Sequence, residues 1–431
     1  MMTRGGVLLA GQLPALAFAI AQTLVLARAL GAQGYGEIVL ITTSVTFVAQ
    51  LIDMRIWEAA TRFGAGFIAR GEPVRARAVL EASAVINVLG GLVACGLVVA
   101  LAGPMADVVG LDVGPAPLRV YAAIAPLLAL TAALTAALRV LDSYRALAWL
   151  VAGGAVLRLA AVVVAVRADL GLDALLLLLV VAEAIGSAAH AAVAHRELKA
   201  KLPAPRGLRS RAQTLLPEAR RMLRFVSLSN LQGTLRLATS YVDVLMVGAI
   251  AGTAAAGTYR LARTFALPMT LVMTPFYQAI YPQLTRAVEE RAFGDVAATV
   301  RHGTKIVGTG LLGAGAVISA ASYWMIPVLA GDDFDGAARI TAIVAAALVI
   351  AGTFFWVIPL ALALDMQLFA LRGVALSALA QVLLLAALVP PLSADGAALA
   401  YLGSTAIWAA LLVPTLVRRV RREARVVGAP L

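Results

Sequence analysis

The sequence is poor in the residues from which metal and nucleotide sites are built. Its single cysteine, Cys95, excludes an intramolecular disulfide and a cysteine metal cluster. The three histidines, His190, His195 and His302, are scattered and have no metal-ligand spacing. The glycine-rich stretch at Gly310 lacks the Lys-Ser pair that would follow it in a nucleotide-binding loop. We therefore expect no metal, no cofactor and no ATP hydrolysis in this chain.

Charge is also scarce, whereas long apolar runs are plentiful. Charged residues make up 13% of the 431-residue chain and apolar residues 62%, with a mean hydropathy of +0.93. Soluble domains have roughly 25% charged and 45–50% apolar residues. The runs are rich in Ala and Leu and show no strand-like alternation, which favours helices over a membrane barrel. The sequence predicts an all-α polytopic membrane protein.

Twelve apolar runs are long enough to cross a hydrocarbon core of about 30 Å. The first is too long and uninterrupted for a signal peptide and has no convincing cleavage site, so it counts as a span. The predicted spans are 6–30, 37–60, 79–101, 118–140, 148–166, 173–194, 225–250, 258–281, 304–329, 338–364, 372–392 and 397–417.

The net charge of +12 could suggest nucleic acid, but the positions of the charges indicate a membrane topology instead. With the N-terminus inside, the inside loops hold 26 of the 35 Lys and Arg residues, and the outside turns hold only four. This is the positive-inside pattern, so we expect both termini in the cytoplasm. The outside turns are too short for a separate extracellular domain, and several are acidic, as at 331–335.

The predicted spans fall into two sets of six around a basic loop broken by Pro203, Pro205 and Pro217. We predict an N-terminal six-helix lobe (1–200), a basic cytoplasmic linker (201–224) and a C-terminal six-helix lobe with a basic tail (225–431). Because six is even, both lobes enter the membrane in the same direction and are related by a pseudo-twofold along the membrane normal. A local match supports this internal repeat, since ALGAQGY at 29–35 resembles IAG at 250–252 followed by GTY at 257–259.

Two longer segments carry a resemblance to a known family. LARALGAQGYGE at 26–37 and YVDVLMVGAIAGTAAAGTYRLAR at 241–263 resemble the polysaccharide flippases of the multidrug/oligosaccharidyl-lipid/polysaccharide exporter superfamily. The resemblance extends over the whole two-lobed organisation. One departure is Arg55 in Asp-Met-Arg-Ile, where the second helix of the family often ends in Asp-Leu-Gly-Leu.

The resemblance implies that the chain is not an enzyme but a flippase. Members move undecaprenyl-diphosphate-linked oligosaccharides from the inner to the outer leaflet of the bacterial inner membrane by alternating access, for lipopolysaccharide, capsule or exopolysaccharide biosynthesis. It also implies a monomer that works beside glycosyltransferases and a polysaccharide polymerase, with membrane lipids around it and no nucleic acid. The alternatives are a cation-coupled multidrug exporter, a flippase for the peptidoglycan precursor and, from another class, a membrane glycan polymerase or ligase.

Several charges fall at mid-depth in the predicted spans, where each costs roughly 2.5–3.5 kcal/mol to insert. Arg158 and Glu183 lie at matching depths in neighbouring spans, and Arg236 lies near the middle of the seventh, with Asp243 two turns further on. Arg158 and Glu183 either tie two helices together or face a cavity. Asp243 and Glu183 are candidate pairing carboxylates, or carboxylates that bind a coupling ion.

Given the flippase resemblance, the mid-depth cations predict a cationic cavity. Arg158 and Arg236 would offer forked donors to phosphate oxygens. Three amides, Asn230, Gln232 and Gln381, would contact the sugars. Three further arginines near the outer ends of spans, Arg28, Arg260 and Arg263, are predicted to extend to the membrane interface.

Overall fold

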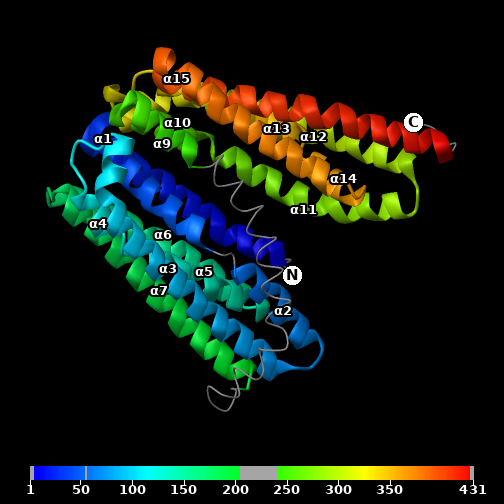
Figure 1. Ribbon diagram of the computed structural model, residues 1–431, viewed down its shortest axis with the longest axis horizontal. Helices are drawn as coiled ribbons and strands as arrows, with labels where there is room; N and C mark the ends of the chain where they lie inside the picture. The colour runs from blue at the N-terminus through cyan, green and yellow to red at the C-terminus, as the bar shows by residue number, and fades with distance from the viewer. Residues whose placement is uncertain (1–3, 54–55, 204–240, 428–431) are drawn as a thin grey trace. The chain divides into compact units, whose positions relative to one another are not determined.

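A computed structural model describes residues 4–53, 56–203 and 241–427, and every regular element within them is a helix (Figure 1). The chain divides into two compact units. Unit 1 comprises Met1–Ala29 and Glu37–Leu237, and unit 2 comprises Leu30–Gly36 and Ala238–Leu431. The predicted linker at 201–224 lies outside the described ranges except for its first three residues.

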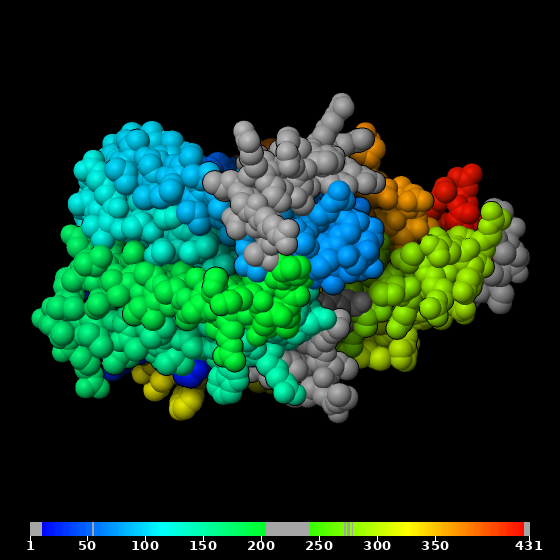
Figure 2. Space-filling view, turned by 90° about the horizontal axis from the view of Figure 1, so that it is seen from below, coloured from blue at the N-terminus to red at the C-terminus, as the bar shows by residue number. Residues whose placement is uncertain are grey.

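Unit 1 is a bundle in which α3 packs against α2 and α5, while α7 packs against α5 and α6. The exposed stripe Leu177, Val181 and Ile185 on α7 shows that the outside of this bundle is apolar, and α7 runs over the outer face seen in Figure 2. Such a surface suits lipid rather than water. The helices are α1 (Arg4–Ile52), α2 (Ile56–Ala69), α3 (Pro73–Val109), α4 (Ala116–Tyr121), α5 (Ile124–Val140), α6 (Tyr144–Arg167) and α7 (Leu172–Lys201).

Unit 2 is organised around α13, which packs against α10, α12 and α15. Its core contains several fully buried large side chains, among them Tyr259, Leu261 and Trp356. The elements are α9 (Val242–Ala251), α10 (Thr253–Ala266), α11 (Pro268–Glu289), α12 (Phe293–Ala330), the short η1 (Asp332–Phe334), α13 (Ala337–Thr353), α14 (Val357–Ala363) and α15 (Gln367–Val427).

Eight of the described helical segments are long and apolar enough to cross a membrane. This agrees with the expected all-α polytopic membrane protein. Two of the eight belong to helices with an internal break, α1 at Gly31 and α15 at Ser393, and each break falls between two predicted spans. The segments are Gly11–Ile52, Pro73–Val109, Ala116–Val140, Tyr144–Arg167, Leu172–Lys201, Phe293–Ala330, Ala337–Ala363 and Gln367–Arg425.

Four predicted spans are not single helices. The fourth, 118–140, is divided between α4 and α5, and the eighth, 258–281, between α10 and α11. The second, 37–60, is divided because α1 ends at Ile52 and α2 begins at Ile56; the first charged residue after the apolar run, Asp53, follows the end of α1. The tenth, 338–364, is divided between α13 and α14. Pro359 explains the break between α13 and α14, since it has no N–H to donate to the carbonyl of Phe355 and its ring crowds that carbonyl. Of the seventh, 225–250, only the part from residue 241 is described.

The predicted inside loops of unit 1 meet at one end of the bundle. The guanidinium of Arg77 donates to the carbonyl of Leu202 at 2.8 Å, and the Lys201 ammonium donates to the carbonyl of Leu141 at 2.7 Å. Between α2 and α3, a hydrogen bond from Arg75 lowers the pKa of the exposed Glu72 carboxyl. Charges of both signs therefore collect at this end, as expected of helix ends that reach water.

The two turns of the predicted repeat have the same backbone conformation and pack against each other within unit 2. Gly31 has φ 65° and ψ −177°, and Gly252 has φ 86° and ψ 175°, a combination that essentially only glycine adopts. A Cβ on Gly257 would lie 3.0 Å from the nitrogen of Gly36, and one on Gly36 would lie 1.9 Å from the carbonyl oxygen of Thr253. The glycines let the two backbones touch.

Gly36→Ala should therefore destabilise the protein by roughly 1–3 kcal/mol or more, because its methyl group meets backbone that cannot rotate away. Gly313→Ala is the matched control, since Gly313 is exposed in α12 with open space around it, and alanine there gains up to about 1 kcal/mol of helix propensity. Thermal unfolding in detergent measures both. A Gly36→Ala protein that unfolds at the wild-type temperature would contradict the close packing.

Candidate functional site

An ion pair with a buried carboxylate joins α6 to α7 in unit 1. The Nη1 of Arg158 lies 3.0 Å from the Oε2 of Glu183, whose side chain is only 5% exposed. The Thr131 hydroxyl lies 3.4 Å from the other carboxylate oxygen and 2.8 Å from the Ser187 hydroxyl. Three helices, α5, α6 and α7, thus contribute to one polar cluster inside an apolar bundle.

The cation of this pair is not fully enclosed. The Arg158 side chain is 40% exposed, and among the described residues only Glu183 accepts a hydrogen bond from it. A guanidinium has five N–H donors, so most remain available to another acceptor. The two alternatives drawn from the sequence are therefore compatible, because Arg158 can pair with Glu183 and still present charge to a ligand.

A long groove, here called the α6 groove, borders this pair. It has a volume of about 1410 Å³ and lies between α1, α6 and α7, all within unit 1. A Cβ on Gly154, which lines it, would lie 3.9 Å from the Nη1 of Arg158. Gly153 and Gly186 also line the groove and have open space where a side chain would be. The apolar wall is made by Phe18, Ala148, Trp149, Leu150, Val156 and Leu157.

The other end of the α6 groove is polar. The Ser143 hydroxyl donates to Glu197 at 2.7 Å, and the Lys201 ammonium lies 2.7 Å from Glu197 and 3.0 Å from Ser143. Arg145 and Asp142 line the same end. The groove therefore runs from a charged helix end along α6, with apolar walls, to Gly153 and Gly154, and Arg158 lies next to it without being one of its lining residues.

Unit 2 holds a second buried charge at Asp243 in α9. This carboxylate is fully buried, accepts a hydrogen bond from the Tyr259 hydroxyl at 2.9 Å and forms an ion pair with Arg263. The Arg263 guanidinium also lies over the rings of Tyr259 and Tyr401, 5.8 and 5.4 Å from their centroids. The cluster joins α9, α10 and α15.

The prediction for Arg263 was wrong. It was expected at the membrane interface, but its guanidinium turns inward to Asp243. The signal was present in the sequence: Asp243 and Arg263 lie at similar distances from Gly252 on the two arms of a helical hairpin, so they have similar depth. The same comparison of depths matches Arg158 with Glu183 in unit 1.

Three predicted ligands, Asn230, Gln232 and Arg236, lie outside the described residues. Gln381 in α15 is 3% exposed, and its amide nitrogen has no hydrogen-bond partner among the described groups. The roles predicted for these four residues stay predictions.

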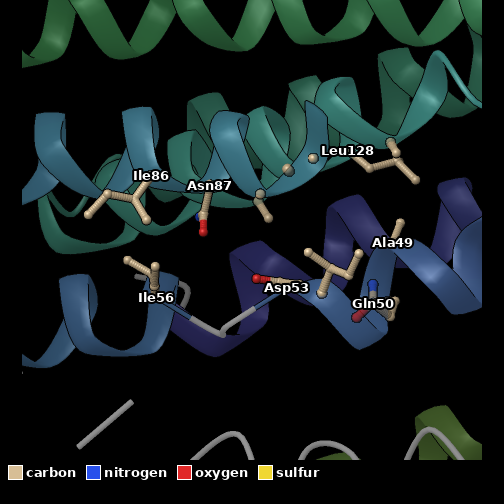
Figure 3. A pocket seen from close by; sticks show the side chains of 13 residues that line it. Ala49, Gln50, Asp53, Ile56, Ile86, Asn87 and Leu128 are labelled. Atoms are coloured by element: carbon tan, nitrogen blue, oxygen red, sulfur yellow. The ribbon is translucent and has the colours of Figure 1, made fainter. Parts of the chain in front are cut away.

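A small hollow of about 60 Å³ adjoins the break between α1 and α2, also within unit 1. Figure 3 shows Asn87 and Asp53 turned toward this space from opposite sides. The Asn87 side chain is 4% exposed, and its amide nitrogen has no partner among the described groups. A hollow of this size has room for about two water molecules, which would satisfy the amide.

The Asp243–Arg263 pair should stabilise the folded protein because each charge neutralises the other. Asp243→Asn or Arg263→Gln alone leaves an uncompensated buried charge, which costs roughly 3–5 kcal/mol. The double variant Asp243→Asn/Arg263→Gln removes both charges and should be more stable than Arg263→Gln. Chemical unfolding of the four proteins gives the coupling free energy. Strictly additive effects would contradict the pairing.

Comparison with known proteins identifies a family and a fold. The family model described as "Polysaccharide biosynthesis protein" matches residues 3–288, more than half of the chain. No curated protein matches the sequence significantly.

Several solved structures have the same fold. An inward-facing multidrug resistance MATE family transporter of the MOP superfamily is 12% identical with a TM-score of 0.75, covering 95% of this chain and 96% of that one. The lipid II flippase MurJ in an inward closed conformation is 10% identical with a TM-score of 0.70, covering 96% and 89%. The Vibrio cholerae MATE transporter VcmN in its bent form is 16% identical with a TM-score of 0.59, covering 97% of each chain.

Proposed function

Because the chain belongs to the polysaccharide biosynthesis protein family and has the MOP-superfamily fold, we propose that it is a lipid-linked oligosaccharide flippase and not an enzyme. It would move an undecaprenyl-diphosphate-linked oligosaccharide from the inner to the outer leaflet for surface polysaccharide biosynthesis. The observation that carries this proposal is the family match, since it ties the transporter fold to polysaccharide biosynthesis.

The site in unit 1 supports this substrate class. A diphosphate-linked sugar is anionic and polar, and it cannot cross hydrocarbon without groups that replace its water. The half-exposed Arg158 guanidinium offers forked donors to phosphate, and the aromatic rings of Phe18 and Trp149 offer flat surfaces to sugars. The apolar remainder of the α6 groove suits a lipid-bound ligand.

We further propose twelve spans in two six-helix lobes that alternate access, with both termini in the cytoplasm of a bacterial inner membrane. The breaks at Gly31 and Ser393 support this number, because each divides one continuous helix into two pieces of membrane-spanning length. The excess of Lys and Arg in the loops on one side of the predicted spans supports the orientation.

The residue roles follow from this proposal. Arg158 and Arg236 would bind phosphate, while Asn230, Gln232 and Gln381 would contact sugars. Glu183 and Asp243 would hold their arginine partners in place. The partners would be the lipid-linked substrate, glycosyltransferases inside and a polymerase outside, with the protein acting as a monomer.

A multidrug exporter is the second candidate, favoured by the structural likeness to MATE transporters. The Arg158 guanidinium beside the α6 groove argues against it, because its remaining N–H donors suit an anionic ligand better than a cationic drug.

Deleting the protein should cause lipid-linked oligosaccharide to accumulate in the inner leaflet, and the wild-type gene should restore transfer. Arg158→Gln should restore it at least tenfold less well, because it removes a charge-assisted hydrogen bond worth roughly 1.5–3 kcal/mol. Arg158→Gln alone leaves the Glu183 carboxylate without its cation, which would also destabilise the fold. The double variant Arg158→Gln/Glu183→Gln removes both charges, so any loss of transfer that remains reports on substrate binding. A fully active double variant would reduce the pair to a structural tie. Drug sensitivity without accumulation would instead indicate export.

Filling the α6 groove should block transfer without unfolding the protein. Gly153→Leu places a side chain in the open volume of the groove, whereas Gly96→Leu on α3 places the same side chain in open space elsewhere on unit 1. We expect transfer to fall at least tenfold for the first and to stay within twofold for the second, at equal expression. Equal transfer by both variants would exclude the groove as a substrate surface.

A further inference from the structure

A pocket at one end of unit 2 gathers arginines from two helices. It has a volume of about 430 Å³, and Arg301 from α12 faces it together with Arg421 and Arg425 from α15. A second hollow of about 450 Å³ adjoins it and shares Arg421 and Arg425, and Arg418 and Arg422 complete its lining. The two hollows together are here called the arginine pocket. Its apolar lining is Ala297, Val300, Trp356, Leu360, Val417 and Val420.

The arginine-bearing end of α15 is held firmly on unit 2. Leu412, Leu416, Val420 and Ala424 recur every four residues and are all at most 5% exposed. This spacing puts them on one face of the helix, which packs inward. The arginines of the same turns are exposed on the other side of the helix. Because the buried face holds the helix in place, it also sets the positions from which the arginine side chains extend.

The opposite wall is equally fixed. Trp356 is 2% exposed, and its indole N–H donates to the Thr304 hydroxyl at 2.8 Å. This bond ties the start of α14 to α12 one turn from Arg301. The pocket is therefore built by packed elements.

The lining chemistry points to a phosphate group rather than to a glycan. Among the described residues, those that line the two hollows are arginines and apolar side chains, with no carboxylate, hydroxyl or amide. Glu423, the acidic residue of the same turns, forms an ion pair with Arg419 at 2.9 Å. The hydroxyls of a sugar need side-chain acceptors, which arginine cannot supply, whereas phosphodiesters pair well with arginine forks and acyl chains suit the valines.

We propose that the arginine pocket binds the headgroup of an anionic membrane phospholipid. Two adjoining hollows that share Arg421 and Arg425 fit the two phosphates of one molecule, so cardiolipin should bind better than a lipid with one phosphate. Basic pockets between membrane helices are suited to such headgroups. This inference does not depend on which substrate the protein moves.

Native mass spectrometry of the purified full-length protein, titrated with cardiolipin, tests the proposal. The variant Arg301→Gln/Arg421→Gln should bind cardiolipin at least tenfold more weakly than the wild type. The control Arg119→Gln/Arg167→Gln removes the same charge from exposed sites in unit 1 and should bind within twofold of the wild type. Thermal unfolding of both variants confirms that they are folded.

Three results would overturn the proposal. Equal weakening by both double variants would show attraction by net charge alone, and unchanged binding in both would place the lipid elsewhere. Undecaprenyl diphosphate that displaces cardiolipin at equal concentration would make the pocket a substrate site. Selective loss in Arg301→Gln/Arg421→Gln, with cardiolipin preferred over phosphatidylglycerol and undecaprenyl diphosphate, supports it.

Discussion

A charge buried among membrane helices needs a partner, and the interior of both units is arranged around this requirement. In unit 1, Arg158 and Glu183 join α6 and α7, and in unit 2, Asp243 and Arg263 join α9 and α10. Each pair spans the two arms of a helical hairpin. Both carboxylates are buried, and the pairs differ in the exposure of the arginine, since the side chain of Arg158 is 40% exposed and that of Arg263 21%. That difference fits the proposal that the pair in unit 2 is structural and that the pair in unit 1 also binds a ligand.

Depth along a helix was the part of the site that the sequence could predict. Residues at equal distance from a turn meet across a hairpin, and this rule matches Arg158 with Glu183 and Arg263 with Asp243. The repeat between 29–35 and 250–259 was also visible, including its turn glycines. The packing of the two turns against each other was not visible, because a local match does not say that Gly36 and Gly257 come together. The arginine pocket depends on contacts between distant segments, which no local pattern contains.

The two cationic features differ in chemistry as well as in position. Arg158 lies at mid-helix next to the α6 groove and pairs with Glu183, a carboxylate that the Thr131 hydroxyl also approaches. The arginine pocket lies at the end of α15 and combines only arginine with apolar groups. The first suits a headgroup that carries sugars and the second a simple phosphodiester. A transporter of lipid-linked glycans needs the first for its substrate, while the second suits the membrane around it.

The most direct test of the central claim is movement of a fluorescent undecaprenyl-diphosphate-linked oligosaccharide across proteoliposomes that contain only this protein. Loss of fluorescence to an impermeant quencher reports the leaflet that the substrate occupies. The account predicts that wild type exposes substrate placed in the inner leaflet, and that Arg158→Gln/Glu183→Gln does so at least tenfold more slowly. Substrate that stays protected from the quencher with the wild-type protein, whichever ion gradient is imposed, would contradict the proposed flippase activity.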